Sequence, residues 1–73
     1  MLTIYSKDNC QQCNMAKMLC DMKGIEYQVK MLDVDYTRED LQALVPSARM
    51  FPVIFKGEDV VGSLNELKAL LSS

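Results

Sequence analysis

Short strand-like runs alternate with helical segments along this chain, and this alternation limits its fold more than any other feature. Leu2–Tyr5 is apolar and β-prone, and a polar break follows it. From Cys13 to Met22 the apolar residues recur at helical spacings, which predicts a helix that Gly24 ends. Apolar and polar residues then alternate through residues 25–33, which predicts a second strand.

The second half of the chain has the signals of a short helix, a hairpin and a last helix. Thr37 can cap a helix with Asp40 as its partner. Residues 52–55 and 60–61 are predicted strands, and the glycine-containing turn between them makes them antiparallel. The segment 63–66 then has the form of a capping box, which opens a final helix.

These elements define a fold class. Their order is β-α-β-α-β-β-α, which predicts an α/β protein with a four-stranded mixed sheet and three helices on its faces. The strand-helix-strand unit at the start implies a right-handed parallel crossover. The loop that contains Cys10 then lies at the carboxyl end of the sheet, where ligands of open α/β folds bind.

Size and charge argue against several classes of function. The chain has 73 residues, so we expect one domain over residues 1–73. Its eight basic and ten acidic residues are scattered, which argues against a nucleic-acid or membrane partner. No apolar stretch approaches the roughly 20 residues that span a bilayer, and the first residues lack the basic and apolar regions of a signal peptide. We therefore expect a cytoplasmic monomer.

Two cysteines stand at the predicted entrance of the first helix. Cys10-Gln11-Gln12-Cys13 places two sulfur atoms across one helical turn, near enough to form a disulfide. The helix N-terminus favours a thiolate at Cys10, and Lys7 adds positive charge if its side chain folds back. We expect Cys10 to attack a substrate disulfide and the more deeply placed Cys13 to resolve the mixed disulfide.

The cysteine pair has two alternative interpretations. A structural zinc site needs four ligands, and this chain has no histidine and no second Cys-x-x-Cys motif, so Cys20 and a carboxylate would have to complete it. The pair could instead only pack, in which case its thiols would keep the ordinary cysteine pKa of about 8.5. The strand directly before the motif favours redox chemistry.

The other sulfur-containing residues of the first helix are interpreted as packing groups. The chain has three cysteines, so one of them stays unpaired within the chain. We interpret Cys20 as a small buried hydrophobe rather than a regulatory thiol. Met15, Met18 and Met22 recur at helical spacing, and we expect them to pack rather than to form a cofactor site or a binding surface.

Three separated segments resemble the glutaredoxin family, in the same order along almost the whole chain. They are Tyr5-Ser6-Lys7-Asp8-Asn9-Cys10-Gln11-Gln12-Cys13, Phe51-Pro52-Val53-Ile54-Phe55 and Val61-Gly62-Ser63-Leu64-Asn65-Glu66-Leu67. The resemblance implies a thioredoxin-like fold of the glutaredoxin type. It also implies a thiol-disulfide oxidoreductase with Cys10 and Cys13 as catalytic residues, no tightly bound cofactor, and glutathione as co-substrate.

The resemblance also implies where glutathione binds. Pro52 would be a cis-proline against the cysteine pair, and the backbone of Phe51 would pair with the cysteinyl part of glutathione, as strand-like backbone can pair with an extended peptide. The turn from Gly62 to Glu66 would receive the γ-glutamyl end, with Lys7 near the glycine carboxylate. The full set of predicted glutathione-binding residues is Lys7, Gln12, Phe51, Pro52, Gly62, Ser63, Leu64, Asn65 and Glu66.

The sequence departs from the family pattern at three places. Dithiol glutaredoxins carry Cys-Pro-Tyr-Cys, whereas both middle residues here are glutamine. Met50-Phe51-Pro52 replaces the usual Thr-Val-Pro, and Gly62-Ser63 replaces a Gly-Gly pair. Gln12 and the short length also resemble the glutaredoxin-like hydrogen donors of ribonucleotide reductase, which take electrons from thioredoxin reductase. The Trp-Ser-Gly-Phe-Arg-Pro segment of that group is absent.

The predicted function is therefore glutathione-coupled thiol-disulfide exchange. The protein would reduce protein disulfides or glutathione mixed disulfides through Cys10 and Cys13, with ribonucleotide reductase as a candidate electron acceptor. An alternative is a redoxin that thioredoxin reductase reduces. An alternative of another class is an iron-sulfur or metal carrier in which Cys10 bridges two chains through a cluster, although a second cysteine able to trap Cys10 as a disulfide opposes it.

Overall fold

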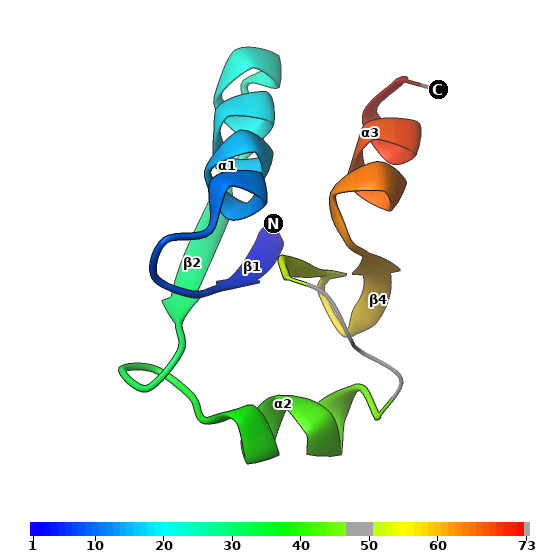
Figure 1. Cartoon of the computed structure of the whole chain (residues 1–73). Helices are drawn as coiled ribbons and strands as arrows, with labels where there is room; N and C mark the ends of the chain where they lie inside the picture. The colour runs from blue at the N-terminus through cyan, green and yellow to red at the C-terminus, as the bar shows by residue number, and fades with distance from the viewer. Residues whose placement is uncertain (47–50, 73) are drawn as a thin grey trace.

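The computed structural model, which describes residues 1–46 and 51–72, contains the predicted order of elements. The four strands form one mixed sheet in the order β2-β1-β3-β4 (Figure 1). This confirms the predicted thioredoxin-like α/β fold class. Of the helices in the described ranges, none has the length and apolar character that a bilayer span needs. The elements are β1 (Leu2–Ser6), α1 (Gln11–Lys23), β2 (Tyr27–Met31), α2 (Arg38–Leu44), β3 (Val53–Lys56), β4 (Asp59–Gly62) and α3 (Leu64–Ser72).

The strand pairing follows from the connections between the strands. The α1 crossover makes β1 and β2 parallel, with Leu2 opposite Tyr27. The turn at Gly57 makes β3 and β4 antiparallel. β1 and β3 are also antiparallel, with Tyr5 opposite Val53. The carboxyl end of β1, the start of β3 and the end of β4 therefore lie at one end of the sheet.

The helices divide between the two faces of the sheet. Figure 1 shows α1 and α3 on one side and α2 on the other. Because strand side chains alternate between faces, Ile4 packs with residues of α1 and α3, whereas Tyr5 joins the cluster on the α2 side. The buried residues of the first cluster are Leu2, Ile4, Ala16, Cys20, Ile54, Leu64 and Leu67. Those of the second are Tyr36, Leu41 and Val53.

Local capping explains where α1 ends and α2 begins. Gly24 has a φ of 68°, and its N–H donates to the carbonyl of Asp21, so the glycine ends α1 as predicted. Thr37 and Asp40 form the predicted capping box of α2, in which each side chain accepts a hydrogen bond from the other residue's backbone N–H at 3.1 Å.

The entrance of α3 differs from the predicted capping box. The Ser63 hydroxyl donates to the carboxylate of Glu66 at 3.2 Å, so the two side chains bond to each other rather than to backbone amides. The reason is the path of the Glu66 side chain, which folds back over Gly62. That path brings its carboxylate within reach of the hydroxyl.

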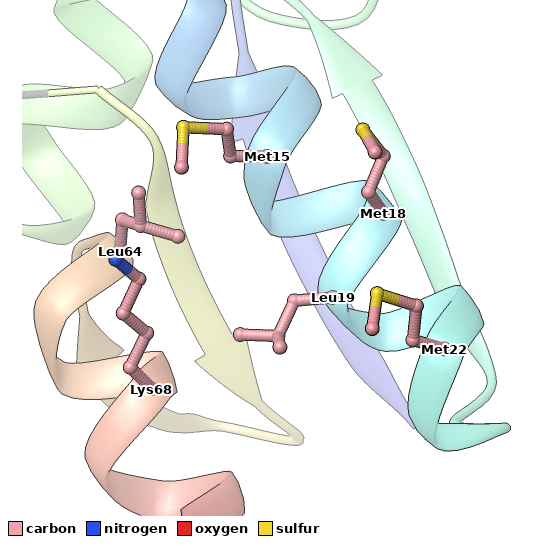
Figure 2. Close-up of a pocket in the computed structure, with 6 residues that line it drawn as sticks. All are labelled: Met15, Met18, Leu19, Met22, Leu64 and Lys68. Carbon is pink, nitrogen blue, oxygen red and sulfur yellow. The ribbon is translucent and has the colours of Figure 1, made fainter.

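The prediction that the methionines of α1 serve as packing groups is wrong. Met15, Met18 and Met22 are 42%, 61% and 79% exposed. The stripe of α1 that faces the sheet is instead Cys13, Ala16 and Cys20, whose spacing is equally helical, so periodicity alone could not choose between the two stripes. The methionines line a shallow apolar groove between α1 and α3, as Figure 2 shows. Its other lining residues are Leu19, Leu64 and Lys68.

Candidate functional site

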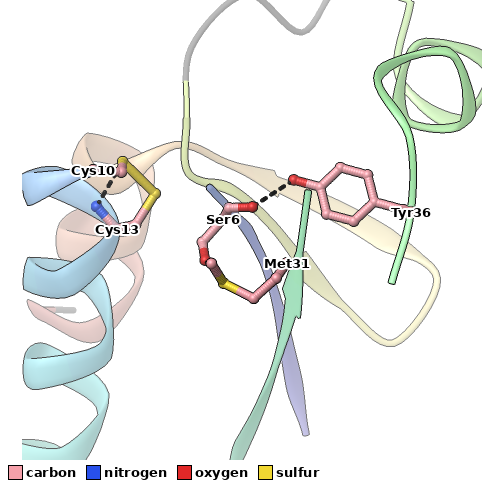
Figure 3. Close-up of a disulfide and its surroundings, with 5 residues drawn as sticks. All are labelled: Ser6, Cys10, Cys13, Met31 and Tyr36. Atoms are coloured by element: carbon pink, nitrogen blue, oxygen red, sulfur yellow. Dashed lines mark hydrogen bonds between the residues drawn. A yellow bond between two sulfur atoms is a disulfide. The ribbon is translucent and has the colours of Figure 1, made fainter. Parts of the chain in front are cut away.

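The cysteine pair lies where a short loop from the central strand β1 enters α1. Cys10 is the N-cap residue of α1, with extended backbone angles, and Cys13 lies in the first turn. The two residues form a disulfide, and their Cα atoms are 5.2 Å apart (Figure 3). This separation lies within the range of about 4.4 to 6.8 Å that a disulfide allows. The spacing of the motif therefore closes a disulfide at the helix entrance, as predicted.

The two cysteines differ in their accessibility to substrates. Cys13 is 1% exposed, whereas Cys10 is only partly buried. The backbone N–H of Cys13 donates to the sulfur of Cys10 at 3.2 Å, and the first turn of α1 holds no acidic residue. The Cys13 amide and the positive end of the helix dipole both favour a thiolate at Cys10 once the disulfide is reduced. These surroundings suit Cys10 for attack on a substrate disulfide. They suit the buried Cys13 for attack on the Cys10 sulfur within the protein.

A buried hydrogen-bond network fixes the start of the cysteine loop. The hydroxyl of Tyr36 donates to the backbone carbonyl of Ser6 at 2.8 Å (Figure 3). The N–H of Leu32 donates to the same carbonyl at 3.0 Å. The hydroxyl of Ser6 in turn donates to the sulfur of Met31 at 3.1 Å. Burial raises the pKa of Tyr36 to about 12, so the phenol stays a donor. Ser6 is the last residue of β1, and the network therefore holds the strand from which the loop begins.

Sequence reasoning missed Tyr36 and Ser6 as parts of the site. The hydrogen bond spans 30 positions in the sequence, and local patterning carries no signal for such a contact. The one indirect signal is the position of Ser6, a polar residue at the end of an apolar strand and fully buried here. A buried hydroxyl needs a partner, but the sequence does not identify that partner.

The segment before β3 forms the second part of the candidate site. The Phe51-Pro52 peptide bond is cis, as the family resemblance implied, and Pro52 is fully buried. The Lys7 ammonium lies over the ring of Phe51, with Nζ 5.4 Å from the ring centroid. Because Tyr5 pairs with Val53 at the same end of the sheet, the structure brings Lys7 and Phe51 together beside the cysteine loop. The neighbouring Met50 lies outside the described residues.

The entrance of α3 forms the third part. Gly62 has a φ of 127°, and β4 ends there beside Ile54 of β3, at the sheet end that carries the cysteine loop. Ser63 is partly buried and Glu66 is exposed, and the carboxylate of Glu66 is already bonded to the Ser63 hydroxyl. Only Oε2 of this carboxylate accepts from the hydroxyl, so Oε1 can still contact a ligand ammonium.

The remaining predicted contact residues separate into buried and exposed side chains. Leu64 is 6% exposed and belongs to the hydrophobic core, so only its backbone could reach a ligand. Asn65 and Gln12 are exposed. Their predicted contacts with glutathione stay predictions.

Cys20 lies apart from the redox pair. It is fully buried among the residues that α1 packs against the sheet, as predicted. Burial raises the pKa of its thiol, and the charge of Asp21 adds to the increase. A buried thiol with a raised pKa is a poor nucleophile. Within residues 1–46 and 51–72, the structure places no three His, Cys, Asp or Glu side chains where they could hold a metal ion.

Comparison with known proteins agrees with this geometry. The glutaredoxin family model matches residues 2–61. The glutaredoxin-like protein NrdH of Escherichia coli K12 is 31% identical over 58 residues, which cover 78% of this chain and 69% of that protein.

Two solved structures extend the comparison to the fold. The buckwheat glutaredoxin-glutathione complex superposes with a TM-score of 0.82 at 27% identity, over 97% of this chain and 67% of that chain. The glutaredoxin of Brucella melitensis superposes with a TM-score of 0.77 at 30% identity, over 97% of this chain and 77% of that chain. The chain therefore belongs to the glutaredoxin family, and it is a thiol-disulfide oxidoreductase with a closed Cys10-Cys13 disulfide at the entrance of α1.

Proposed function

We propose that this protein reduces protein disulfides or glutathione mixed disulfides through Cys10 and Cys13, and that glutathione returns it to the dithiol form. The observation that carries the proposal is the asymmetry of the pair, in which a partly exposed sulfur at a helix entrance is bonded to a sulfur only 1% exposed. Such a pair can capture a substrate at one sulfur and release it with the other.

The reducing half of the cycle consists of two exchanges. The Cys10 thiolate attacks one sulfur of the substrate disulfide, so a new sulfur-sulfur bond forms while the old one breaks, and the other substrate sulfur leaves as a thiolate that takes up a proton. The Cys13 thiol gives its proton to solvent and attacks the Cys10 sulfur. The substrate then leaves as a dithiol, and its two new electrons come from the cysteine pair, which becomes a disulfide.

Glutathione restores the dithiol by the reverse chemistry. One glutathione thiolate attacks the Cys10 sulfur and frees Cys13, and a second attacks the sulfur of the bound glutathione and frees Cys10. The product is glutathione disulfide. The backbone of Phe51 would pair with the cysteinyl part of glutathione, Lys7 would meet its glycine carboxylate, and the free amides at the start of α3 would receive its γ-glutamyl carboxylate. The structural relative from buckwheat is a glutaredoxin-glutathione complex, which supports this choice of co-substrate.

We further propose that the chain works as a single monomeric domain over residues 1–73 in the cytoplasm, with protein disulfides such as that of ribonucleotide reductase as electron acceptors. A reducing compartment suits a protein whose disulfide opens and closes in each cycle. Size-exclusion chromatography with light scattering tests the monomer, and a defined reductase assay tests the acceptor.

Reduction by thioredoxin reductase is a second candidate, and two observations favour it. The Ser63 hydroxyl already donates to one oxygen of the Glu66 carboxylate, so it competes with the ammonium of glutathione for part of that carboxylate. The curated relative at 31% identity is a glutaredoxin-like protein rather than a glutaredoxin by name. Parallel incubation of the oxidised protein with glutathione plus glutathione reductase, and with thioredoxin reductase, separates the candidates. Reduction by the second system alone would overturn the glutathione proposal.

An iron-sulfur or metal carrier is the alternative of another class. It requires a Cys10 thiolate that stays available to a cluster, and the disulfide with Cys13 removes that thiolate. Iron analysis after anaerobic purification tests this alternative. Stoichiometric iron with a coloured protein would favour it over the reductase.

A further inference from the structure

The contact between Lys7 and Phe51 follows from the strand register. β1 and β3 pair antiparallel, with Ile4 opposite Ile54 and Tyr5 opposite Val53. If this register continues two residues beyond Tyr5, the next two pairs are Ser6 with Pro52 and Lys7 with Phe51. The observed contact of the Lys7 ammonium with the Phe51 ring agrees with this extended register.

The ring of Phe51 is the partner that the structure gives to the Lys7 ammonium. Nζ lies 5.4 Å from the ring centroid, which is within the roughly 6 Å at which an aromatic face attracts a cation. Among residues 1–46 and 51–72, no carboxylate forms an ion pair with Lys7, and both side chains are partly buried. A partly desolvated ring attracts the cation more strongly than an exposed one.

The position of the Lys7 ammonium matters because Cys10 follows Lys7 closely in the chain. Lys7 lies three residues before Cys10, in the loop whose sulfur receives the Cys13 amide at 3.2 Å. A lysine side chain in solvent spreads its charge over many rotamers. A ring that holds the ammonium at one place concentrates the charge at the sheet end where a thiolate forms.

We propose that Phe51 is a positioning residue, whose ring holds the Lys7 ammonium beside the cysteine pair so that the lysine charge stabilises the Cys10 thiolate. The role rests on the proposed function of Cys10 as the attacking thiol. A chain with the usual Thr-Val-Pro has valine in place of Phe51 and would lack this role, because an aliphatic side chain has no quadrupole to attract a cation. Among the described residues, the other charged groups that follow strands or open a helix at this end are Asp8 in the same loop, Asp33 and Asp35 after β2, and Glu66 at the start of α3.

The test measures the reactivity of Cys10 directly. In a Cys13→Ser background, the rate of alkylation of Cys10 by iodoacetamide is followed against pH, with the modified residue located by mass spectrometry. The variants are Phe51→Leu, Phe51→Tyr, Lys7→Met and the double variant Phe51→Leu/Lys7→Met. Phe55→Leu is the matched control, because Phe55 is an aromatic residue of the same strand and cluster whose ring packs on Tyr5 instead.

The proposal predicts a specific pattern among these variants. Phe51→Leu raises the pKa of Cys10 and slows alkylation below that pKa by about two- to fivefold. Phe51→Tyr, which keeps the ring, stays close to the parent protein, as does Phe55→Leu. In the Lys7→Met background the leucine substitution has no further effect, because the charge that the ring positions is gone.

Two outcomes would overturn the proposal. One is a Phe51→Leu variant, folded by circular dichroism, that keeps the parent pH profile. The other is a Phe51→Leu substitution that shifts the pKa of Cys10 by the same amount in the Lys7 and the Lys7→Met backgrounds, which would assign the effect to packing of the ring. The assay needs neither glutathione nor a reductase, so either outcome leaves the proposed function to its own test.

Discussion

The hydroxyl of Tyr36 donates a hydrogen bond to the backbone carbonyl of Ser6 at 2.8 Å, and so links the segment before α2 to the last residue of the strand that leads into the cysteine loop. Tyr36 is 7% exposed, and its ring also packs edge-on against Tyr5 with centroids 4.9 Å apart. The α2 side of the sheet therefore helps to fix the geometry of a site that lies on the side of α1.

Removal of this hydroxyl tests the link. We expect Tyr36→Phe to lower the free energy of unfolding by about 1 kcal/mol, the usual net value of one hydrogen bond, because the Ser6 carbonyl keeps its bond from Leu32. Urea denaturation measures the change. Tyr5→Phe is the matched control, since the Tyr5 hydroxyl forms no hydrogen bond with the residues that the structure describes. Equal losses in both variants would contradict the assigned role.

The pH dependence of stability gives a second test of the same residue. The pKa of Tyr36 is about 12 in the folded protein, against an ordinary value of 10. Because the folded pKa is the higher one, the unfolded chain loses its proton first, so this contribution to stability is complete below pH 10 and is lost as the pH rises through 12. Tyr36→Phe should remove that part of the alkaline destabilisation. Unfolding midpoints between pH 9 and 12 measure it, and identical alkaline slopes in both proteins would refute the prediction.

Gly62 should tolerate a side chain poorly. Its φ is 127°, and a Cβ there would lie 2.7 Å from Cγ of Glu66. We expect Gly62→Ala to cost about 1 to 3 kcal/mol of unfolding free energy, through backbone strain and this clash. Gly57→Ala is the matched control, because it also has a positive φ but nothing within 4 Å of the new Cβ.

The clash and the strain can be separated with a second substitution. Glu66→Ala removes Cγ and should recover part of the loss at Gly62, measured again by denaturant unfolding. A Gly62→Ala variant that is no less stable than Gly57→Ala would show that Glu66 moves aside without cost.

Exposed and buried apolar side chains should respond differently to substitution. Met18 is 61% exposed, so Met18→Gln should change the unfolding free energy by no more than about 0.5 kcal/mol. Leu67 of α3 is fully buried against α1 and the sheet, and Leu67→Ala should cost about 2 to 5 kcal/mol. Thermal or chemical unfolding measures both. A large loss for Met18→Gln would mean that the methionine stripe is buried in solution.

The sequence predicted those features whose physical cause is local. Gly24 ends α1 and Thr37 with Asp40 caps α2 because each signal acts within a few residues of itself. The Cys10-Cys13 spacing fixed the disulfide for the same reason. Family resemblance supplied the cis bond before Pro52, which no periodicity would have indicated.

The features that were missed depend on contacts between distant segments. The helical spacing of Met15, Met18 and Met22 was compatible with packing, and only the way α1 lies on the sheet shows that these side chains are exposed. The bond from Tyr36 to Ser6 likewise becomes visible only when β1 and α2 are placed together. The hydrogen bond from Ser63 to Glu66 replaced a capping box because Glu66 folds back over a glycine.

The account as a whole depends on the separate roles of the two cysteine sulfurs. Reduction of a small protein disulfide, with glutathione and glutathione reductase as the electron source, should be abolished in Cys10→Ser. In Cys13→Ser incubated with the substrate disulfide in the absence of glutathione, mass spectrometry should find the substrate held at Cys10 as a mixed disulfide, because no second thiol is present to release it. A Cys10→Ser protein that reduces the substrate at the parent rate would contradict the account.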